Sequence, residues 1–326
     1  MYLSILLLFI FTAKFPIILA SDGDRSPFYQ NCLKSCLKEN CTGDGHSFTS
    51  AALKQQDFWC RLLKWSCREE CQYNCMWKTV NGFQERGYSI PKFHGKWPFV
   101  RLWGVQEPAS AFASLLNLAS HIYMHNEIAK RFSVKNTPLV LFWHGFAMVC
   151  MNAWTWSTIF HTRDTPFTEF MDYACALSMV MSLFVAAIVR VFHRRKKFAM
   201  AILALPILYY VEHVRYLYSG RIDYDYNMMV NIFFGVLGSA TWVCWAGGQL
   251  AAGRRHAWRV AAFTALSGAA LALELLDFAP RRAWDAHALW HLATAPLPLL
   301  FYRFVIDDLQ YLQRSKIVVK NDLKLT

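Results

Sequence analysis

The sequence has few charged residues for its length. Only 17% of its 326 residues are Asp, Glu, Lys or Arg, whereas a soluble domain of this size has roughly 25%. This shortage argues against a cytosolic enzyme, and the 55% of hydrophobic residues argues against a disordered chain. The net charge of +12 would suit a nucleic-acid-binding protein, but the basic residues stand in short clusters between apolar runs, as in membrane proteins. We therefore expect a membrane protein that does not bind nucleic acid.

Internal repeats, Gly-rich phosphate loops and low-complexity tracts are also missing, and the cysteines do not form CxxC pairs. A zinc ribbon is therefore not expected. Seven of the ten cysteines fall between residues 21 and 96, as Cys32-x3-Cys36-x4-Cys41, then Cys60, then Cys67-x3-Cys71-x3-Cys75. Such a density indicates an oxidising compartment and a disulfide framework.

The amino-terminal residues 1–20 form an apolar stretch that ends in Ala20, before a polar run. This pattern predicts a cleaved secretory signal peptide. An uncleaved anchor helix is the alternative, because no basic residue precedes the apolar core and Lys14 interrupts it.

Cysteines four residues apart share one face of a helix. Two such helices packed antiparallel would be joined as Cys32–Cys75, Cys36–Cys71 and Cys41–Cys67, which leaves Cys60 without a partner. Asn40-Cys41-Thr42 is an N-glycosylation sequon, so we expect a glycoprotein, although a disulfide at Cys41 would hide the asparagine.

From residue 97 onward the chain is a series of apolar runs of about 20 residues, the length that crosses a bilayer. We expect an all-α fold with seven transmembrane helices at about 98–120, 138–160, 169–191, 198–217, 227–248, 258–277 and 285–305. The connections after the first, third and fifth spans carry the excess of Lys and Arg, which places them in the cytosol. The expected order is a signal peptide (1–20), a luminal cysteine-rich domain (21–96), a seven-helix transmembrane domain (97–305) and a cytoplasmic tail (306–326).

Five polar residues of the spans fall at one depth on the luminal side. Ser157 and His161 end the second span, Asp172 begins the third, and His287 and His291 lie one turn apart in the seventh. Three imidazoles with an open position suit catalytic zinc. We expect the three histidines to bind zinc, Asp172 to activate or orient a water molecule, and Ser157 to stabilise the oxyanion of a tetrahedral intermediate.

The same residues allow a second interpretation. Ser157, His161 and Asp172 could form a metal-free Ser-His-Asp triad, although this would leave the other two histidines without a role. Glu274 and Asp277 near the end of the sixth span either line the same cavity or make structural pairs. Glu107 lies within the first turns of the first span, and the sequence does not say whether it contributes to the site.

Six strings resemble the Per1-like family of GPI-lipid remodelling factors. They are PKFHGKWPF (91–99), QEPASA (106–111), NAWTWSTIFHTRDT (152–165), MDY (171–173), LELLDF (273–278) and DAHALWH (285–291). The cysteine pattern is similar too, with Cys60 additional, and the resemblance runs from about residue 29 to the last span. This family belongs with alkaline ceramidases and adiponectin receptors to a superfamily of seven-span hydrolases. Its shared pattern of Ser-x3-His, Asp and His-x3-His falls on Ser157, His161, Asp172, His287 and His291.

The resemblance implies a zinc-dependent GPI-specific phospholipase. Its substrate would be the sn-2 acyl ester of the phosphatidylinositol of GPI-anchored proteins, in the Golgi or the endoplasmic reticulum membrane. Such an ester lies near the lipid headgroups, where the luminal helix ends are expected. The alternative from another class is a seven-span lipid-binding receptor or GPI-protein escort, in which zinc is structural.

Overall fold

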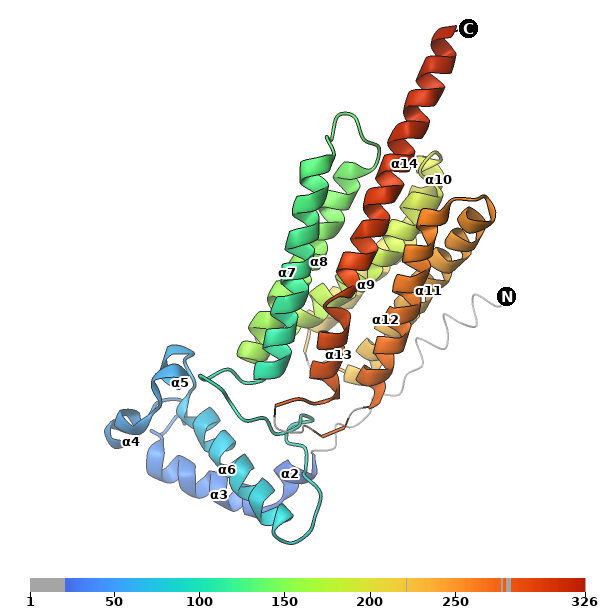
Figure 1. Cartoon of the computed structure of the whole chain (residues 1–326). Coiled ribbons are helices and arrows are strands. Elements are labelled where there is room, and N and C mark those ends of the chain that lie inside the picture. Colours follow the sequence, from blue (N-terminus) through green and yellow to red (C-terminus); the bar gives the residue numbers. More distant parts are fainter. Residues whose placement is uncertain (1–20, 221, 277, 280–282, 326) are drawn as a thin grey trace. The chain divides into compact units, whose positions relative to one another are not determined.

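The computed structural model describes residues 21–220, 222–276, 278–279 and 283–325, with side chains to residue 315 (Figure 1). The predicted signal peptide, Asp277 and part of the loop before the last helices lie outside the described residues. The chain forms two compact units, one of residues 1–106 with 279–283, and one of residues 107–278 with 284–326.

The first unit is made of short helices held by disulfides. Its helices are α2 (Asp22–Arg25), α3 (Pro27–Asn40), α4 (Ser50–Gln55), α5 (Phe58–Leu62) and α6 (Cys67–Gln84). Helix α6 begins with a capping box, in which Ser66 and Glu69 each bond the other's backbone N–H. Helices α3 and α6 lie side by side (Figure 1), and the cysteines on their facing sides form disulfides.

The predicted disulfide pairing is confirmed. The three bonds join Cys32 to Cys75, Cys36 to Cys71, and Cys41 to Cys67. The sulfur atoms of Cys41, Cys67 and Cys71 lie close enough together to suggest a metal site, but each is consumed in a disulfide and provides no thiolate. Cys60 is a half-buried free thiol, as the spacing predicted. Asn40 is half-buried and donates to the Cys36 carbonyl, and its glycosylation stays a prediction.

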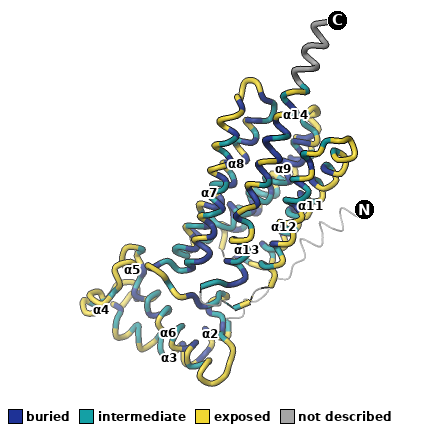
Figure 2. Tube along the Cα trace, viewed as in Figure 1, coloured by how far each residue is buried: buried dark blue, intermediate teal, exposed yellow. Residues whose placement is uncertain are grey.

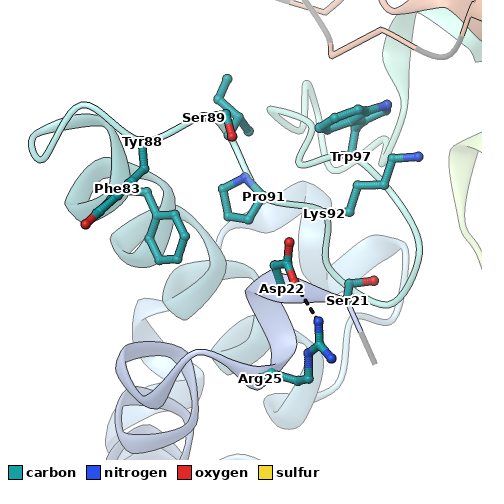
Figure 3. Close-up of a pocket in the computed structure, with 10 residues that line it drawn as sticks. Ser21, Asp22, Arg25, Phe83, Tyr88, Ser89, Pro91, Lys92 and Trp97 are labelled. Atoms are coloured by element: carbon teal, nitrogen blue, oxygen red, sulfur yellow. Dashed lines mark hydrogen bonds and ion pairs between the residues drawn. The ribbon is translucent and has the colours of Figure 1, made fainter. Parts of the chain in front are cut away.

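A cleft of about 560 Å³ opens in the first unit between α2 and residues 83–97 (Figure 3). Its lining mixes charges and rings, with the Lys92 ammonium 4.8 Å from the Trp97 ring centre and an Asp22–Arg25 ion pair of 2.6 Å. Gly23 donates its N–H to the Lys92 carbonyl, and a Cβ on Gly23 would lie 2.5 Å from that oxygen. Only glycine allows this close approach, which fixes one wall of the cleft.

The second unit is a bundle of long helices. They are α7 (Pro108–Arg131), α8 (Val140–Thr162), α9 (Pro166–Val191), α10 (Lys196–Tyr218), α11 (Tyr224–Ala251), η1 (Arg255–Ala257), α12 (Trp258–Leu276), α13 (Ala286–Thr294) and α14 (Leu297–Leu325). Helix α9 packs against α8, α10 and α11, and the α13–α14 pair packs against α7 and α12. The core between them is rich in large rings, among them Trp143, Trp242, Phe301 and Phe304. The described residues contain no strands, only isolated bridges, so the all-α fold is confirmed.

Five helical segments of the described chain are long and apolar enough to cross a membrane: α9, α10, α11, η1–α12 and the α13–α14 pair. Many of their side chains are exposed (Figure 2), as expected for faces that contact lipid. Helices α7 and α8 have 24 and 23 residues, or roughly 35 Å of helix each, but they are not among these five segments. The protein is therefore an all-α membrane protein, and the two further spans stay predictions.

The first long helix begins later than expected. The prediction of a helix from residue 98 is wrong, because α7 begins at Pro108. Residues 102–105 form a tight turn instead, in which Trp103 and Gly104 have positive φ and Leu102 bridges to Val105. Pro108 then starts the helix at a position where a missing backbone N–H has no cost.

Candidate metal centre

The second unit brings together the three histidines that the sequence singled out. His161 lies in the last turn of α8, and His287 and His291 lie one turn apart in α13. One nitrogen from each ring lies within 4.8 Å of the other two. The Nε2 atoms of His287 and His291 are 2.8 Å apart. These three side chains are called the histidine cluster below.

A different acceptor faces the Nδ1 atom of each ring. His161 Nδ1 lies 2.7 Å from a Glu107 carboxylate oxygen, and His287 Nδ1 lies 2.7 Å from one of Glu274. A carboxylate accepts hydrogen bonds, so both rings carry their proton on Nδ1. The other ring nitrogen, Nε2, then keeps its lone pair, as a metal ligand requires.

The third ring is oriented by a hydroxyl group. His291 Nδ1 lies 3.4 Å from Ser114 Oγ. Ser114 donates its only hydroxyl proton to the Ser110 carbonyl at 2.8 Å, so its oxygen accepts from His291 Nδ1–H. His291 therefore has the same tautomer as the other two histidines, and its Nε2 lone pair also faces the centre.

The cluster has the electrostatics of a cation site. Three lone pairs converge where His161 and His291 are buried and His287 is half-buried, and two of them face each other at 2.8 Å. Among the described residues, His161 Nε2 is buried without a hydrogen-bond partner, which is costly unless a ligand completes it. In their ionised forms Glu107 and Glu274 carry two negative charges, which a divalent cation would balance. The geometry suits zinc with three histidine ligands, since Zn–N distances of about 2.0–2.1 Å place such nitrogens roughly 3.3 Å apart.

Local structure explains why these side chains meet. Asp285 caps α13 by accepting from the Ala288 N–H at 2.8 Å, so the helix begins at Ala286, one residue before His287. Glu107 is the N-cap residue of α7, and its N–H donates to the His161 carbonyl at 2.9 Å. The start of α7 and the end of α8 are thus joined through backbone and side chain of the same two residues.

Ser157 lies one turn before His161 on α8 and is buried. Its Oγ is 3.1 Å from Ser114 Oγ. A Ser-His-Asp triad requires the serine hydroxyl to bond a histidine nitrogen, but His161 bonds Glu107 through Nδ1 and has no described partner at Nε2. The contacts of Ser157 therefore do not favour the metal-free triad.

Asp172 lies half-buried in the second turn of α9. Its carboxylate is not among the ligand atoms that lie within 4.8 Å of one another in the histidine cluster. The structure therefore does not add Asp172 to the three possible ligands. Its expected part in activating water stays a prediction.

Two partners of the cluster were only partly foreseen. Glu274 was expected either to line the cavity or to make a structural pair, and the contribution of Glu107 was left open; both bond a candidate ligand ring. Ser114 was not singled out. Its signal was the polar face of α7, where Glu107, Ser110, Ser114 and Asn117 recur every three or four residues and are all buried.

Comparison with known proteins identifies similar chains. Residues 58–309, which include the whole histidine cluster, match the model of the Per1-like family. The Drosophila melanogaster protein "Post-GPI attachment to proteins factor 3" is 44% identical over 292 residues, covering 88% of this chain and 89% of the relative. The proteins named "GPI-specific phospholipase A2-like PGAP3" are 42% identical in Danio rerio (93% and 95% covered) and 40% in Homo sapiens (90% and 91% covered). No solved structure matches this chain.

Proposed function

Because this chain belongs to the Per1-like family, we propose that it is a GPI-specific phospholipase that depends on zinc. Its substrate is the sn-2 acyl ester of the phosphatidylinositol of GPI-anchored proteins. The names of the relatives, which refer to GPI attachment and to a GPI-specific phospholipase A2-like activity, support this substrate class.

One observation carries the catalytic part of the proposal. The Nε2 lone pairs of His161, His287 and His291 converge in a buried place, and acceptors at Nδ1 fix all three tautomers. Three histidine ligands leave a fourth position open, as in catalytic zinc sites. A bound zinc ion would supply Lewis-acid chemistry and lower the pKa of a water molecule to near neutrality.

The chain's own residues would then divide the remaining work. Asp172 accepts a proton from the attacking water, whose oxygen bonds to the sn-2 carbonyl carbon. Ser157 donates its hydroxyl to the carbonyl oxygen as negative charge develops there. When the bond from that carbon to the glycerol oxygen breaks, the glycerol oxygen takes up the proton, and a fatty acid and a lysolipid leave.

The position of the cluster supports a luminal site, and the family resemblance is the basis for placing it in the Golgi membrane. It lies at the end of α8 and the start of α13, whereas the basic connections lie at the opposite helix ends, beside Lys135, Arg194 and Arg254. Basic connections mark the cytosolic side, so the cluster faces the lumen. Tryptophans line the site there, with the rings of Trp154 and Trp290 centred 5.2 and 4.8 Å from the His291 ring.

Replacing His287 or His291 by Ala tests the proposal in cells that lack the endogenous activity. Mass spectrometry of the GPI lipid should show that the unsaturated sn-2 chain persists, because two ligands cannot hold the metal. His144→Ala is the matched control, since His144 lies on α8 but bonds His125, at 3.0 Å. The proposal is overturned if the chain disappears normally in the His287 and His291 variants.

An assay with the purified protein distinguishes the phospholipase from the receptor or escort alternative. Full-length chain with bound zinc should release labelled fatty acid from a GPI lipid. Zinc and lipid binding without any release would support a structural zinc site instead.

A further inference from the structure

The last membrane segment is broken immediately after the metal-ligand candidate His291. Helix α13 ends at Thr294 and α14 begins at Leu297, around Pro296 and Pro298. Proline has no N–H to donate. The neighbouring N–H groups of Ala295 and Leu299 instead donate to carbonyls three residues earlier, those of Leu292 and Pro296, at 3.3 and 3.1 Å. The carbonyls of His291 and Ala295 therefore lose the helical partners four residues ahead.

Helix α7 supplies new partners for both carbonyls. Asn117 donates from Nδ2 to the His291 carbonyl at 2.7 Å, and Ser120 donates from Oγ to the Ala295 carbonyl at 2.8 Å. Asn117 is 1% exposed, and the two residues are one turn apart on the face of α7 that meets the break. The hydroxyl of Thr294, in the last turn of α13, adds one bond to the His291 carbonyl at 3.0 Å.

The three histidines are not held in the same way. Carboxylates 2.7 Å away orient His161 and His287 through Nδ1, whereas the Nδ1 atom of His291 faces the Ser114 oxygen at the longer distance of 3.4 Å. The shortest hydrogen bond that another helix makes to His291 is on its backbone, from Asn117. The position of this ligand is thus determined more by its main chain than by its ring.

We propose that Asn117 and, more weakly, Ser120 are positioning residues, which hold the helix break so that His291 Nε2 meets the metal. This inference rests on the proposed function, because it assumes that the cluster binds zinc. Partners of metal ligands typically contribute 10- to 100-fold to metal affinity when they act on the ligand ring. The short Asn117 bond is expected to have an effect of that size through the backbone.

The test measures metal binding by full-length chain in detergent, with zinc competed by a chelator and with Co²⁺ as a spectroscopic probe. Asn117→Leu, of similar size without the donor, should weaken binding about 10- to 100-fold and shift the visible Co²⁺ bands. Ser120→Ala should shift the bands less. Asn231→Leu is the matched control, since Asn231 is a half-buried membrane-helix asparagine that donates only within its own helix, to Asn227.

The outcomes separate this inference from the proposed function. Wild-type chain that binds neither zinc nor Co²⁺ overturns both. Wild-type chain that binds metal, with Asn117→Leu matching Asn231→Leu in affinity and spectrum, overturns the positioning role alone. If Asn117→Leu does not fold, Asn117→Gln, which keeps an amide donor on a longer side chain, takes its place. It should bind metal with a shifted spectrum, and an unchanged spectrum and affinity would contradict the proposal.

Discussion

Two buried polar clusters of the second unit differ in how completely their atoms are paired. In the carboxylate cluster, Asp308 accepts two hydrogen bonds from Arg190, at 2.5 and 2.7 Å, and lies 3.2 Å from His256 Nε2. Asp308 is fully buried, yet both of its oxygens have cationic or N–H partners. In the histidine cluster, lone pairs face one another and His161 Nε2 has no described partner.

The difference separates a cluster that protein groups complete from one whose centre is open to a ligand. The carboxylate cluster joins α9, η1 and α14, and its charges are satisfied by protein groups. The histidine cluster lies roughly 25 Å away along the last segment, because His291 and Asp308 are 17 positions apart in the sequence and a helix rises about 1.5 Å per residue. Acceptors orient its rings through the Nδ1 atoms, whereas the Nε2 atoms at its centre have no proton donor among the protein groups described. Burial alone therefore does not identify a candidate ligand site. Buried nitrogen lone pairs without a protein partner do.

Removing the metal should have the largest effect. A strong chelator should abolish fatty-acid release from the purified chain, and added zinc should restore it. The carboxylate cluster contains no convergent lone pairs and so does not depend on the metal. The helix content measured by circular dichroism should therefore stay nearly unchanged after chelation. If fatty-acid release continues after metal analysis shows that all zinc has been removed, the histidine cluster does not need a metal for activity, and this distinction between the two clusters is wrong.

Breaking the carboxylate cluster should affect stability and leave metal binding alone. Asp308→Ala leaves Arg190 as a buried unpaired charge, which typically costs about 3–5 kcal/mol. Thermal unfolding in detergent measures the loss. Asp307→Ala is the control, because Asp307 pairs with Arg259 where both side chains are about a third exposed, and it should cost at most about 1 kcal/mol. A parallel loss of zinc affinity in Asp308→Ala would show that the clusters are not independent.

The smallest effect is expected from a single acceptor of the histidine cluster. Glu274→Gln keeps the size of the side chain but removes the charge that faces His287 Nδ1, so zinc affinity should fall about 10- to 100-fold. Competition with a chelator measures this change. Glu212→Gln should have no effect, because Glu212 and its partner Arg215 are mostly exposed. Equal affinities in the two variants would remove Glu274 from the site.

Much of the architecture could be predicted because it follows from spacing. Cysteines four apart fixed the disulfide register, and the four-residue interval between His287 and His291 placed both rings on one helix face. The start of α7 could not be predicted in the same way. Residues 98–107 are apolar enough to extend a helix, but the turn at Trp103 and Gly104 and the start of the helix at Pro108 exclude them from it.

The partners across helices were harder to foresee. Asp308 lies beyond the last apolar run, which was expected to end at residue 305, yet α14 continues through it. The carboxylate is tolerated because Arg190, 118 residues earlier, reaches it. Ser114 and Asn117 are equally invisible as ligand supports until α7 is known to pack against α13. Such pairings depend on tertiary contacts that no local pattern encodes.

The order of the ligands along the chain has a consequence for biosynthesis. His161 and Glu107 are joined as soon as the first two long helices pair, but α13 is made more than a hundred residues later. During translation the early half supplies only one of the three imidazoles of the histidine cluster. If the cluster binds a metal as proposed, the metal can be loaded only after the last helices have been inserted, and a chain truncated before residue 287 would keep most of its helices but lack two of the three candidate ligands.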